Sequence, residues 1–470
     1  MTLTDLTATE VSSLLERREV SAPEVMTAAL DRIEAVNGPV NAVVSLRDRE
    51  DLMAAARAAD AAPRKGWLHG IPIAVKDLAN AAGLPTSMGS PIFRDFRPRT
   101  DDLAIGRMRD AGAIFIGKTN VPEFGLGSHS VNPVHGPCRN PWDVSRSAGG
   151  SSGGAGVALS LGMQWVCDGS DMMGSLRNPA AWNNVYGFRP SWGLVPGEPV
   201  GDVFLHPLST LGPMARNPRD LTRLLDTMAG PDPRQPFSLP RAEPLAPDIE
   251  AEVKGRRIAW AADWGGAYAM EDGVLDTCEA ALAAFDAMGC TVEKIDPPFP
   301  AEEIWDSWTT LRSFAVAAKQ GVLYNNPEHR ALLNFNTTWE TERGLKLTAM
   351  EVQAASLKRS RWWAAAVALF KDYDALVLPV AQCWPFPVDW AWPREVGGRE
   401  MDTYHRWMEV VIPASLLGLP ALSVPAGFGA AGLPMGLQII GPRGGDLGVL
   451  QLGQAWHEAT DWHARRPPVG

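Results

Sequence analysis

Short apolar runs alternate with longer helical stretches along the chain from Gly70 onward. Runs of four to eight apolar residues suit buried strands, whereas the longer stretches repeat apolar residues at the spacing of a helix face. The chain passes in this way through Ile71–Val75, Leu103–Met108, Ala113–Ile116 and Val157–Leu161. This alternation predicts an α/β protein with a central sheet that helices cover on both faces.

The two ends of the chain extend this pattern. In the first 60 residues, apolar side chains recur at helical spacing and predict two helices before the first strand. Late in the chain, further apolar runs predict strands at Ala375–Val380, Leu422–Val424 and Gly436–Ile440. We therefore expect one central sheet that takes strands from both ends of the chain.

The region from about 230 to 400 is less regular. It contains a proline-rich stretch, a predicted strand at Arg257–Ala261, a predicted helix at Gly273–Met288 and a Trp-rich helical stretch. At 470 residues the chain is too long for one small core. We interpret it as a single domain over 1–470, with a core at 70–200 and a smaller helical lobe beside the pocket at about 230–400.

Composition excludes several classes of function. Hydrophobic residues make up 46% and charged residues 21% of the chain, as in a globular enzyme. The net charge of −11 gives no general attraction for nucleic acid or anionic lipid. The uncharged stretch 148–167 holds six glycines and predicts a buried loop and helix, so no membrane span is expected. Met1–Glu10 lacks the features of a secretion signal, which favours a cytoplasmic protein. The five cysteines form no Cys-x-x-Cys pair and predict neither disulfides nor a metal site.

A formal match to a phosphate-binding loop lies at Gly112–Thr119. Taken alone, it would predict a nucleotide hydrolase. Such a loop needs a flexible turn whose backbone N–H groups reach the phosphates. The four variable positions read Ala-Ile-Phe-Ile, which is typical of a strand. We therefore expect a strand here and no nucleotide site.

Two overlapping Gly-x-Ser-x-Gly matches lie in Gly149–Gly154 and could place an esterase nucleophile on a strand-to-helix turn. Such an enzyme also needs a downstream acid and a histidine. His405 and His457 lie downstream, but neither sits in a loop of small residues that would present an imidazole to Ser151. The spacing alone leaves this interpretation open.

A third interpretation combines the same serines with a lysine. The apolar run that begins at Gly70 leads directly into Lys76. Burial at the end of this strand would lower the pKa of the amine and favour its neutral, basic form. Many apolar strands end in a solvated lysine instead, so this segment alone does not decide between the two environments. Ser151 and Ser175, each in a glycine-containing segment, are the candidate partners.

Several segments carry a resemblance to a known family. They are Gly70–Asp77, Gly117–Asn120, Arg139–Asp143, Gly149–Gly154, Gly169–Ala180, Tyr186–Ser191, Pro413–Ala421, Val424–Gly427 and Gly436–Gln438. In these segments the sequence resembles the amidase signature family, and only about 230–370 lacks the resemblance. The resemblance implies a mixed, twisted sheet covered by helices on both faces, and an amidase that uses no metal or organic cofactor.

The resemblance also implies the roles of three residues. Ser175 is the nucleophile, Lys76 is the base, and Ser151 is a bridging serine that in the family follows a cis peptide bond. A serine hydroxyl is a weak nucleophile at neutral pH, so its proton must pass through the Ser151 hydroxyl to the neutral amine. The same path can return the proton to the leaving amine.

The segment before the nucleophile is expected to form the oxyanion hole. Its donors would be the backbone N–H groups of Met172, Met173, Gly174 and Ser175. The family commonly has two glycines before the nucleophile, whereas this chain has Met173 and then Gly174. Backbone donors do not depend on side chains, so the difference bears on substrate shape. Whether the two methionines pack into the core or narrow the acyl side of the pocket stays open.

Other residues of these segments are candidates for supporting or binding roles. Asp171 and Arg177 could form an ion pair that braces the nucleophile loop, and Ser152 could join the same hydrogen-bond network. The pocket walls are expected in 124–137 and in the Trp-rich stretch 384–407. The candidate substrate-binding residues are Phe124, Gly125, Ser128 and Ser170.

The sequence thus predicts an amidohydrolase that forms an acyl-enzyme on Ser175 and cleaves an apolar or aromatic small-molecule amide. Family members are often dimers, so a homodimer is compatible with the resemblance. Three alternatives stay open: a carbamate (urethane) or ester hydrolase with the same triad, the glutaminase subunit of a tRNA-dependent amidotransferase, and a scaffold whose serines are inert.

Overall fold

The structure, a computed structural model, describes residues 2–240 and 243–469. The strands are β1 (Val43–Val44), β2 (Pro72–Lys76), β3 (Ile114–Thr119), β4 (Val131–Asn132), β5 (Gly136–Pro137), β6 (Val166–Asp171), β7 (Tyr186–Arg189), β8 (Thr210–Ala215), β9 (Arg257–Trp260), β10 (Thr291–Lys294), β11 (Ala375–Pro379), β12 (Glu395–Val396), β13 (Arg399–Glu400), β14 (Ala421–Phe428) and β15 (Pro434–Ile440).

The α-helices are α1 (Ala8–Glu16), α2 (Ala22–Val40), α3 (Arg49–Ala61), α4 (Leu103–Asp110), α5 (Gly153–Ser160), α6 (Arg177–Trp182), α7 (Pro218–Met228), α8 (Val274–Ala281), α9 (Ala283–Ala287), α10 (Ala301–Asn325), α11 (Pro327–Arg330), α12 (Phe335–Leu345), α13 (Ala349–Asp372), α14 (Ile412–Leu417) and α15 (Asp446–Ala459). Short 3-10 turns connect several of them, among them η3 (Glu123–Gly125) and η5 (Arg406–Val411).

A central eight-stranded sheet has the order β10-β9-β11-β15-β14-β7-β8-β6. The pairs β10/β9 and β9/β11 are parallel, and the other pairs are antiparallel. The sheet is therefore mixed, and the predicted α/β fold is confirmed. The strands predicted near the C-terminus appear as β11, β14 and β15 in this sheet.

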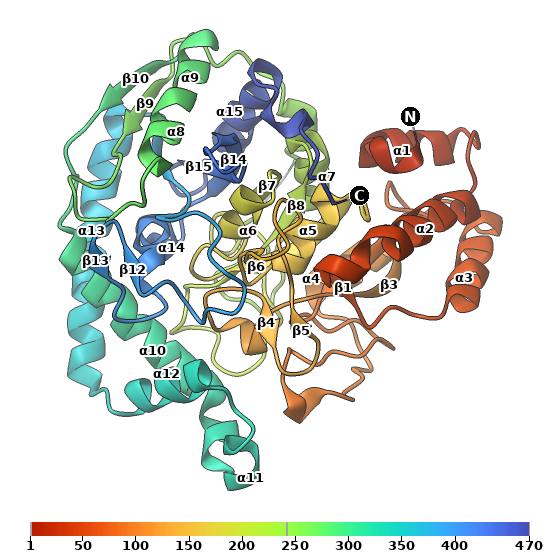
Figure 1. The fold of residues 1–470 in the computed structure, drawn as a ribbon, viewed down its shortest axis with the longest axis horizontal. Helices are drawn as coiled ribbons and strands as arrows, with labels where there is room; N and C mark the ends of the chain where they lie inside the picture. The colour runs from red at the N-terminus through yellow and green to blue at the C-terminus, as the bar shows by residue number, and fades with distance from the viewer. Residues whose placement is uncertain (1, 241–242, 470) are drawn as a thin grey trace.

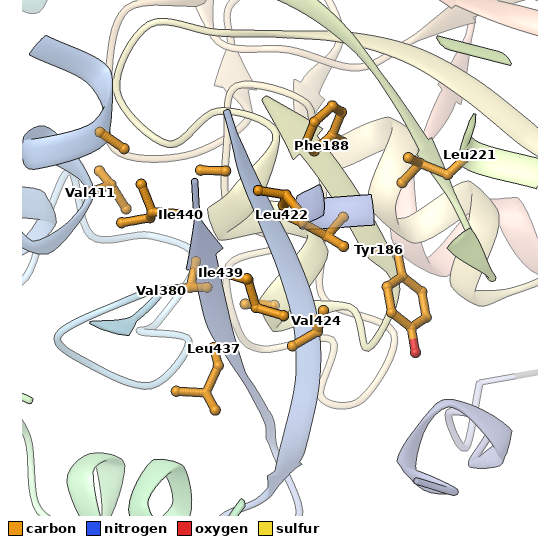
Figure 2. Close-up of a cluster of buried hydrophobic side chains, with 14 of the residues drawn as sticks. Tyr186, Phe188, Leu221, Val380, Val411, Leu422, Val424, Leu437, Ile439 and Ile440 are labelled. Carbon is orange, nitrogen blue, oxygen red and sulfur yellow. The ribbon is translucent and has the colours of Figure 1, made fainter. Parts of the chain in front are cut away.

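Helices cover this sheet on both faces, as the alternation of side chains along β15 shows. Gln438 points toward α6, where it accepts a hydrogen bond from Arg177. Its neighbour Ile439 points the other way, and so does its cross-strand partner Leu422 of β14, which packs closely against Gly453 of α15. Figure 2 shows Leu422 and Ile439 within the buried apolar cluster on that side.

The early strands differ from the prediction of one common sheet. β2 and β3 pair in parallel, β1 pairs antiparallel to β3, and together they form a separate three-stranded sheet. Helices α2 and α3 lie beside it, on the side of the molecule away from α10–α13 (Figure 1). Apolar periodicity predicts that a segment is a strand but not which strand it pairs with, and this explains the difference.

The region from about 230 to 400 divides between the sheet and a helical lobe. β9, β10 and β11 form one end of the central sheet. Helix α10 packs against both α12 and α13, and α11 projects from this lobe (Figure 1). Trp308 and Trp362 are fully buried there, so these two tryptophans serve packing.

The two sheets meet at β6, the edge strand of the central sheet. The Asp168 carboxylate of β6 accepts a hydrogen bond of 3.0 Å from the backbone N–H of Lys76 in β2. This contact brings the end of β2 to the end of β6, where the sequence motifs converge. Within residues 2–240 and 243–469, no helix is both long and apolar enough to cross a membrane.

Candidate active site

Lys76 ends β2 and is only 1% exposed. Its ammonium nitrogen, Nζ, lies 2.9 Å from Oγ of Ser151, 2.7 Å from Oγ of Ser152 and 3.0 Å from Oγ of Ser170. The structure therefore places this lysine in the buried environment rather than the solvated one. Three hydroxyl groups, which can accept from a charged amine or donate to a neutral one, surround it.

Burial lowers the pKa of Lys76 to about 7, although the negative charges of Asp168 and Asp171 act in the opposite direction. Desolvation penalises the charged ammonium form, and the two carboxylates stabilise it. A lysine with this pKa is about half neutral at physiological pH. It can both take up and release a proton during one reaction cycle.

Ser151 lies in a tight turn that leads into α5. The peptide bond between Gly150 and Ser151 is cis, the arrangement that the family resemblance implies. The first turn of α5 then runs directly against the backbone of the small sheet. A Cβ on Gly154 would come within 2.3 Å of the Asn120 nitrogen, so only glycine permits this approach. The glycine-rich segment is thus a close-packed turn that fixes Ser151 beside Lys76.

Ser175 follows β6 in a short turn before α6 and is half-buried. Its carbonyl oxygen accepts a hydrogen bond of 3.2 Å from the backbone N–H of Ser152. The nucleophile loop and the turn that carries Ser151 are therefore joined through their backbones. Gly174, with φ of +80°, makes the reversal just before the serine.

A buried ion cluster supports the nucleophile loop. The Asp171 carboxylate accepts hydrogen bonds from the backbone N–H groups of Gly174 at 2.9 Å and Leu176 at 3.2 Å. It also pairs with Arg177 at 3.0 Å and Arg189 at 3.1 Å, and all three charged side chains are fully buried. Burial alone would raise the pKa of Asp171, but the two guanidinium groups outweigh it and hold the pKa well below its ordinary value.

Arg177 extends the cluster into the rest of the fold. Its guanidinium donates to the side chains of Gln438 in β15 at 2.6 Å and Ser415 in α14 at 2.7 Å. It also donates to the Val411 carbonyl at 3.1 Å. The predicted ion pair between Asp171 and Arg177 is therefore present, and it connects the loop to three other segments.

The predicted oxyanion hole needs one adjustment. The N–H of Gly174 already donates a hydrogen bond to the Asp171 carboxylate, so it does not point to a substrate oxyanion. The N–H groups of Met172, Met173 and Ser175 are left as the candidate donors. The Met173 side chain packs into the main core, whereas Met172 is only partly buried beside that core. Of the two methionines, Met172 is thus the better candidate for substrate contact.

The four predicted substrate-binding residues lie in different surroundings. Gly125 is near Ser151, and Phe124 precedes it. The Ser128 hydroxyl is buried, accepts from the Trp407 indole at 2.8 Å and donates to the Tyr404 carbonyl at 3.3 Å. Ser170 directs its hydroxyl to Lys76. These contacts connect Ser128 to the packing of the loop and Ser170 to the lysine.

Two charged residues of the site are not singled out by the sequence. Asp168 stands on the same face of β6 as Ser170 and holds the backbone of Lys76, and Arg189 on β7 completes the cluster around Asp171. Both lie within or next to segments of the family resemblance, which is the signal that could have identified them. Their contacts join residues far apart in the chain, and local spacing does not reveal such contacts.

The competing interpretations do not match the structure. Lys118 of the formal phosphate-binding motif lies on strand β3, fully buried, and donates to the Ala79 carbonyl. His405 lies beside Glu340, and burial lowers its pKa to about 4. His457 contacts the Tyr186 hydroxyl. Among the described residues, no group of three or more His, Cys, Asp and Glu side chains could hold a metal ion.

We predict that Asp171→Asn lowers the free energy of unfolding by about 3–5 kcal/mol, because two buried guanidinium groups lose their counter-charge. The matched control is Asp31→Asn, which disrupts an exposed pair with Arg49 and should cost at most about 1 kcal/mol. Denaturant unfolding of both variants measures the difference. Equal losses would contradict a supporting role for Asp171.

Gly125→Ala is predicted to reduce turnover more than stability. An added Cβ would lie 2.8 Å from Cδ1 of Leu78 and 3.5 Å from Oγ of Ser151, at a φ of +74° that alanine adopts poorly. We expect a loss of at least about tenfold in kcat/KM. Gly266→Ala, at φ of +85° in open space, carries the same backbone cost and controls for it. Similar activities of the two variants would refute the crowding argument.

Comparison with known proteins agrees with this fold. The family described as Amidase matches residues 24–450. An acylamidase of Rhodococcus erythropolis is 33% identical over 98% of this chain and 97% of its own length. A glutamyl-tRNA(Gln) amidotransferase subunit of Moorella thermoacetica is also 33% identical, over 100% of both chains.

Among solved structures, a bacterial aryl acylamidase of the amidase signature family superimposes with a TM-score of 0.90. It is 28% identical, and the match covers 98% of this chain and 99% of that one. These similarities extend over nearly the whole chain and include the segments that build the site. The chain belongs to the amidase signature family, whose members are hydrolases acting on carbon–nitrogen bonds.

Proposed function

We propose that the protein hydrolyses the amide bond of an apolar or aromatic small molecule through an acyl-enzyme on Ser175. In this proposal Lys76 is the base, and Ser151 relays the proton from Ser175 to Lys76. The observation that carries it is the contact of 2.9 Å between Nζ of Lys76 and Oγ of Ser151, at a lysine whose pKa is lowered to about 7.

The proposed reaction has two stages. Ser175 Oγ attacks the carbonyl carbon while its proton passes through the Ser151 hydroxyl to the neutral amine of Lys76. The carbon–nitrogen bond then breaks, and the proton returns through Ser151 to the leaving nitrogen. Water next attacks the acyl-enzyme by the same proton path and releases the acid and Ser175. Backbone N–H groups beside Met172 and Met173 would stabilise the oxyanion of each stage.

The substrate class is supported by the apolar side chains beside the site. Met172 lies next to the candidate oxyanion donors. Leu78 lies close to Gly125, which is beside Ser151, and Phe124 precedes Gly125 in the chain. The similarity to an acylamidase and to an aryl acylamidase favours the same class. A carbamate or ester would fit the same chemistry with a different leaving group.

A second candidate is the glutaminase reaction of a tRNA-dependent amidotransferase. The equal identity to the amidotransferase subunit of Moorella thermoacetica favours its inclusion. The acyl part of glutamine carries two charged groups that would need charged partners, whereas Met172, which lies beside the candidate oxyanion donors, is apolar. A substrate panel separates the two candidates.

We predict that Ser175→Ala and Lys76→Ala each lower kcat/KM at least a hundredfold, because each removes a group that the acylation step requires. The panel comprises an aryl anilide, an aliphatic amide, an aryl carbamate, a nitrophenyl ester and glutamine. We expect wild-type protein to prefer the anilide or the aliphatic amide to glutamine.

Two matched controls accompany these variants. Ser360→Ala and Lys371→Ala change exposed residues of α13 and should leave turnover unchanged. If Lys76→Ala keeps its activity while a histidine variant loses it, the proposed triad is wrong. A fluorophosphonate probe that leaves wild-type Ser175 unlabelled would support the inert scaffold instead.

The pH dependence tests the base directly. Because Lys76 must be neutral to accept the proton and its pKa is lowered to about 7, kcat/KM should rise about tenfold per pH unit below 7 and level off above it. Lys76→Arg should be inactive at every pH, since a guanidinium stays protonated. A rate that is flat between pH 5 and pH 7 would refute this assignment.

A further inference from the structure

Phe124 precedes Gly125, the residue that lies beside the bridging serine. The position that a Cβ of Gly125 would take is 3.5 Å from Oγ of Ser151. Gly125 has no side chain, and the nearest side-chain atom to that position is Cδ1 of Leu78, at 2.8 Å. Phe124 is the adjacent residue with a side chain, and it is half-buried.

The backbone of Phe124 is unusual for a bulky residue. Its φ of 53° and ψ of 15° place it in the left-handed region, where a side chain costs about 1–2 kcal/mol. Its N–H donates a hydrogen bond of 2.8 Å to the carbonyl of Met88, which itself has φ of 53°. Outliers of this kind cluster at ligand sites, where surrounding structure enforces them. A glycine at position 124 would avoid this backbone cost. We therefore expect the phenyl ring to have a role that offsets it.

The ring of Phe124 begins a series of three aromatic rings. The Phe93 ring lies edge-on to it with centroids 6.1 Å apart, and the Phe96 ring lies edge-on to Phe93, also at 6.1 Å. Phe93 is partly buried, and Phe96 is 42% exposed. The series therefore runs from the residue beside Gly125 out to the solvent.

The opposite side of the same segment is held by the helical lobe. The buried Glu123 carboxylate accepts a hydrogen bond of 2.9 Å from the backbone N–H of Asn334, just before α12. Nδ2 of Asn336 lies 3.3 Å from the Cβ position of Gly127. The backbone around Phe124 is thus held between two loops.

We propose that Phe124 is a specificity-determining residue that selects amides whose leaving amine carries an aryl ring. This inference rests on the proposed function, in which Ser151 returns the proton to the leaving nitrogen. A substituent on that nitrogen must lie beside Ser151, where Gly125, Leu78 and the neighbouring Phe124 are the apolar groups. An aryl substituent there gains ring contacts with Phe124 that an alkyl group of similar size does not make. The acyl group lies on the side of Met172 and gains nothing from Phe124.

The test compares Phe124→Leu and Phe124→Ala with wild type on three substrates. They are para-nitroacetanilide, N-butylacetamide and N-butyl phenylacetamide, which place the ring on the amine, on neither group and on the acyl group. We expect kcat/KM for the anilide to fall about three- to tenfold relative to both butylamides. Leucine keeps the apolar volume, so Phe124→Leu separates loss of the ring from loss of folding.

The matched control is Phe428→Leu, which removes a half-buried ring packed against Trp142 at the end of β14. It should leave the ratio of anilide to butylamide turnover unchanged. Binding of para-nitroaniline, followed by quenching of tryptophan fluorescence, gives a readout independent of turnover. We expect it to weaken in both Phe124 variants and to stay unchanged in Ser175→Ala.

Equal losses on all three substrates, or a loss that follows the ring on the acyl group, would overturn the inference. Equal binding of para-nitroaniline by the Phe124 variants and by wild type would also overturn the inference, even if the wild-type protein hydrolysed none of the amides. A different result contradicts the proposed function, namely turnover by Ser175→Ala at the wild-type rate. The two proposals can therefore be judged apart.

Discussion

One buried carboxylate, Asp171, organises the site. Removing a carboxylate from water is costly unless charges and hydrogen bonds compensate it, and Asp171 has two guanidinium groups and two backbone N–H donors. Because its partners come from the nucleophile loop, β7 and, through Arg177, β15 and α14, none of these can move without exposing an uncompensated charge. The position of Ser175 is thus fixed by electrostatics as well as by apolar packing.

The alternation of side chains along β6 explains how one strand serves both halves of the site. Successive residues of a strand point to opposite faces. Asp168 and Ser170 therefore face β2, where they hold the backbone and the amine of Lys76. Asp171 faces the other way, toward Arg177 and Arg189. The base and the nucleophile loop receive their supports from a single edge strand, so their relative position depends little on the surrounding loops.

The features that depend on local sequence pattern were predictable from the sequence. They are the α/β class, the strands β2, β11, β14 and β15, and the strand character of the formal phosphate-binding motif around Lys118. The sequence pattern did not predict that β2 and β3 form a separate sheet, or that Arg189 and Asp168 support the site. Strand pairing and buried ion clusters are decided by contacts between distant residues, and neither periodicity nor spacing encodes them. The commitment of the Gly174 N–H to Asp171 likewise depends on a side-chain orientation that the sequence does not specify.

The methionine at position 173 shows how the loop can vary without losing its donors. The family commonly has glycine there, yet Met173 is 3% exposed and packs into the main core. An oxyanion hole is made of backbone N–H groups, so a side chain that points inward leaves them in place. Met172 is only partly buried beside that core. Changes of substrate shape are therefore expected from position 172, and changes of loop stability from position 173.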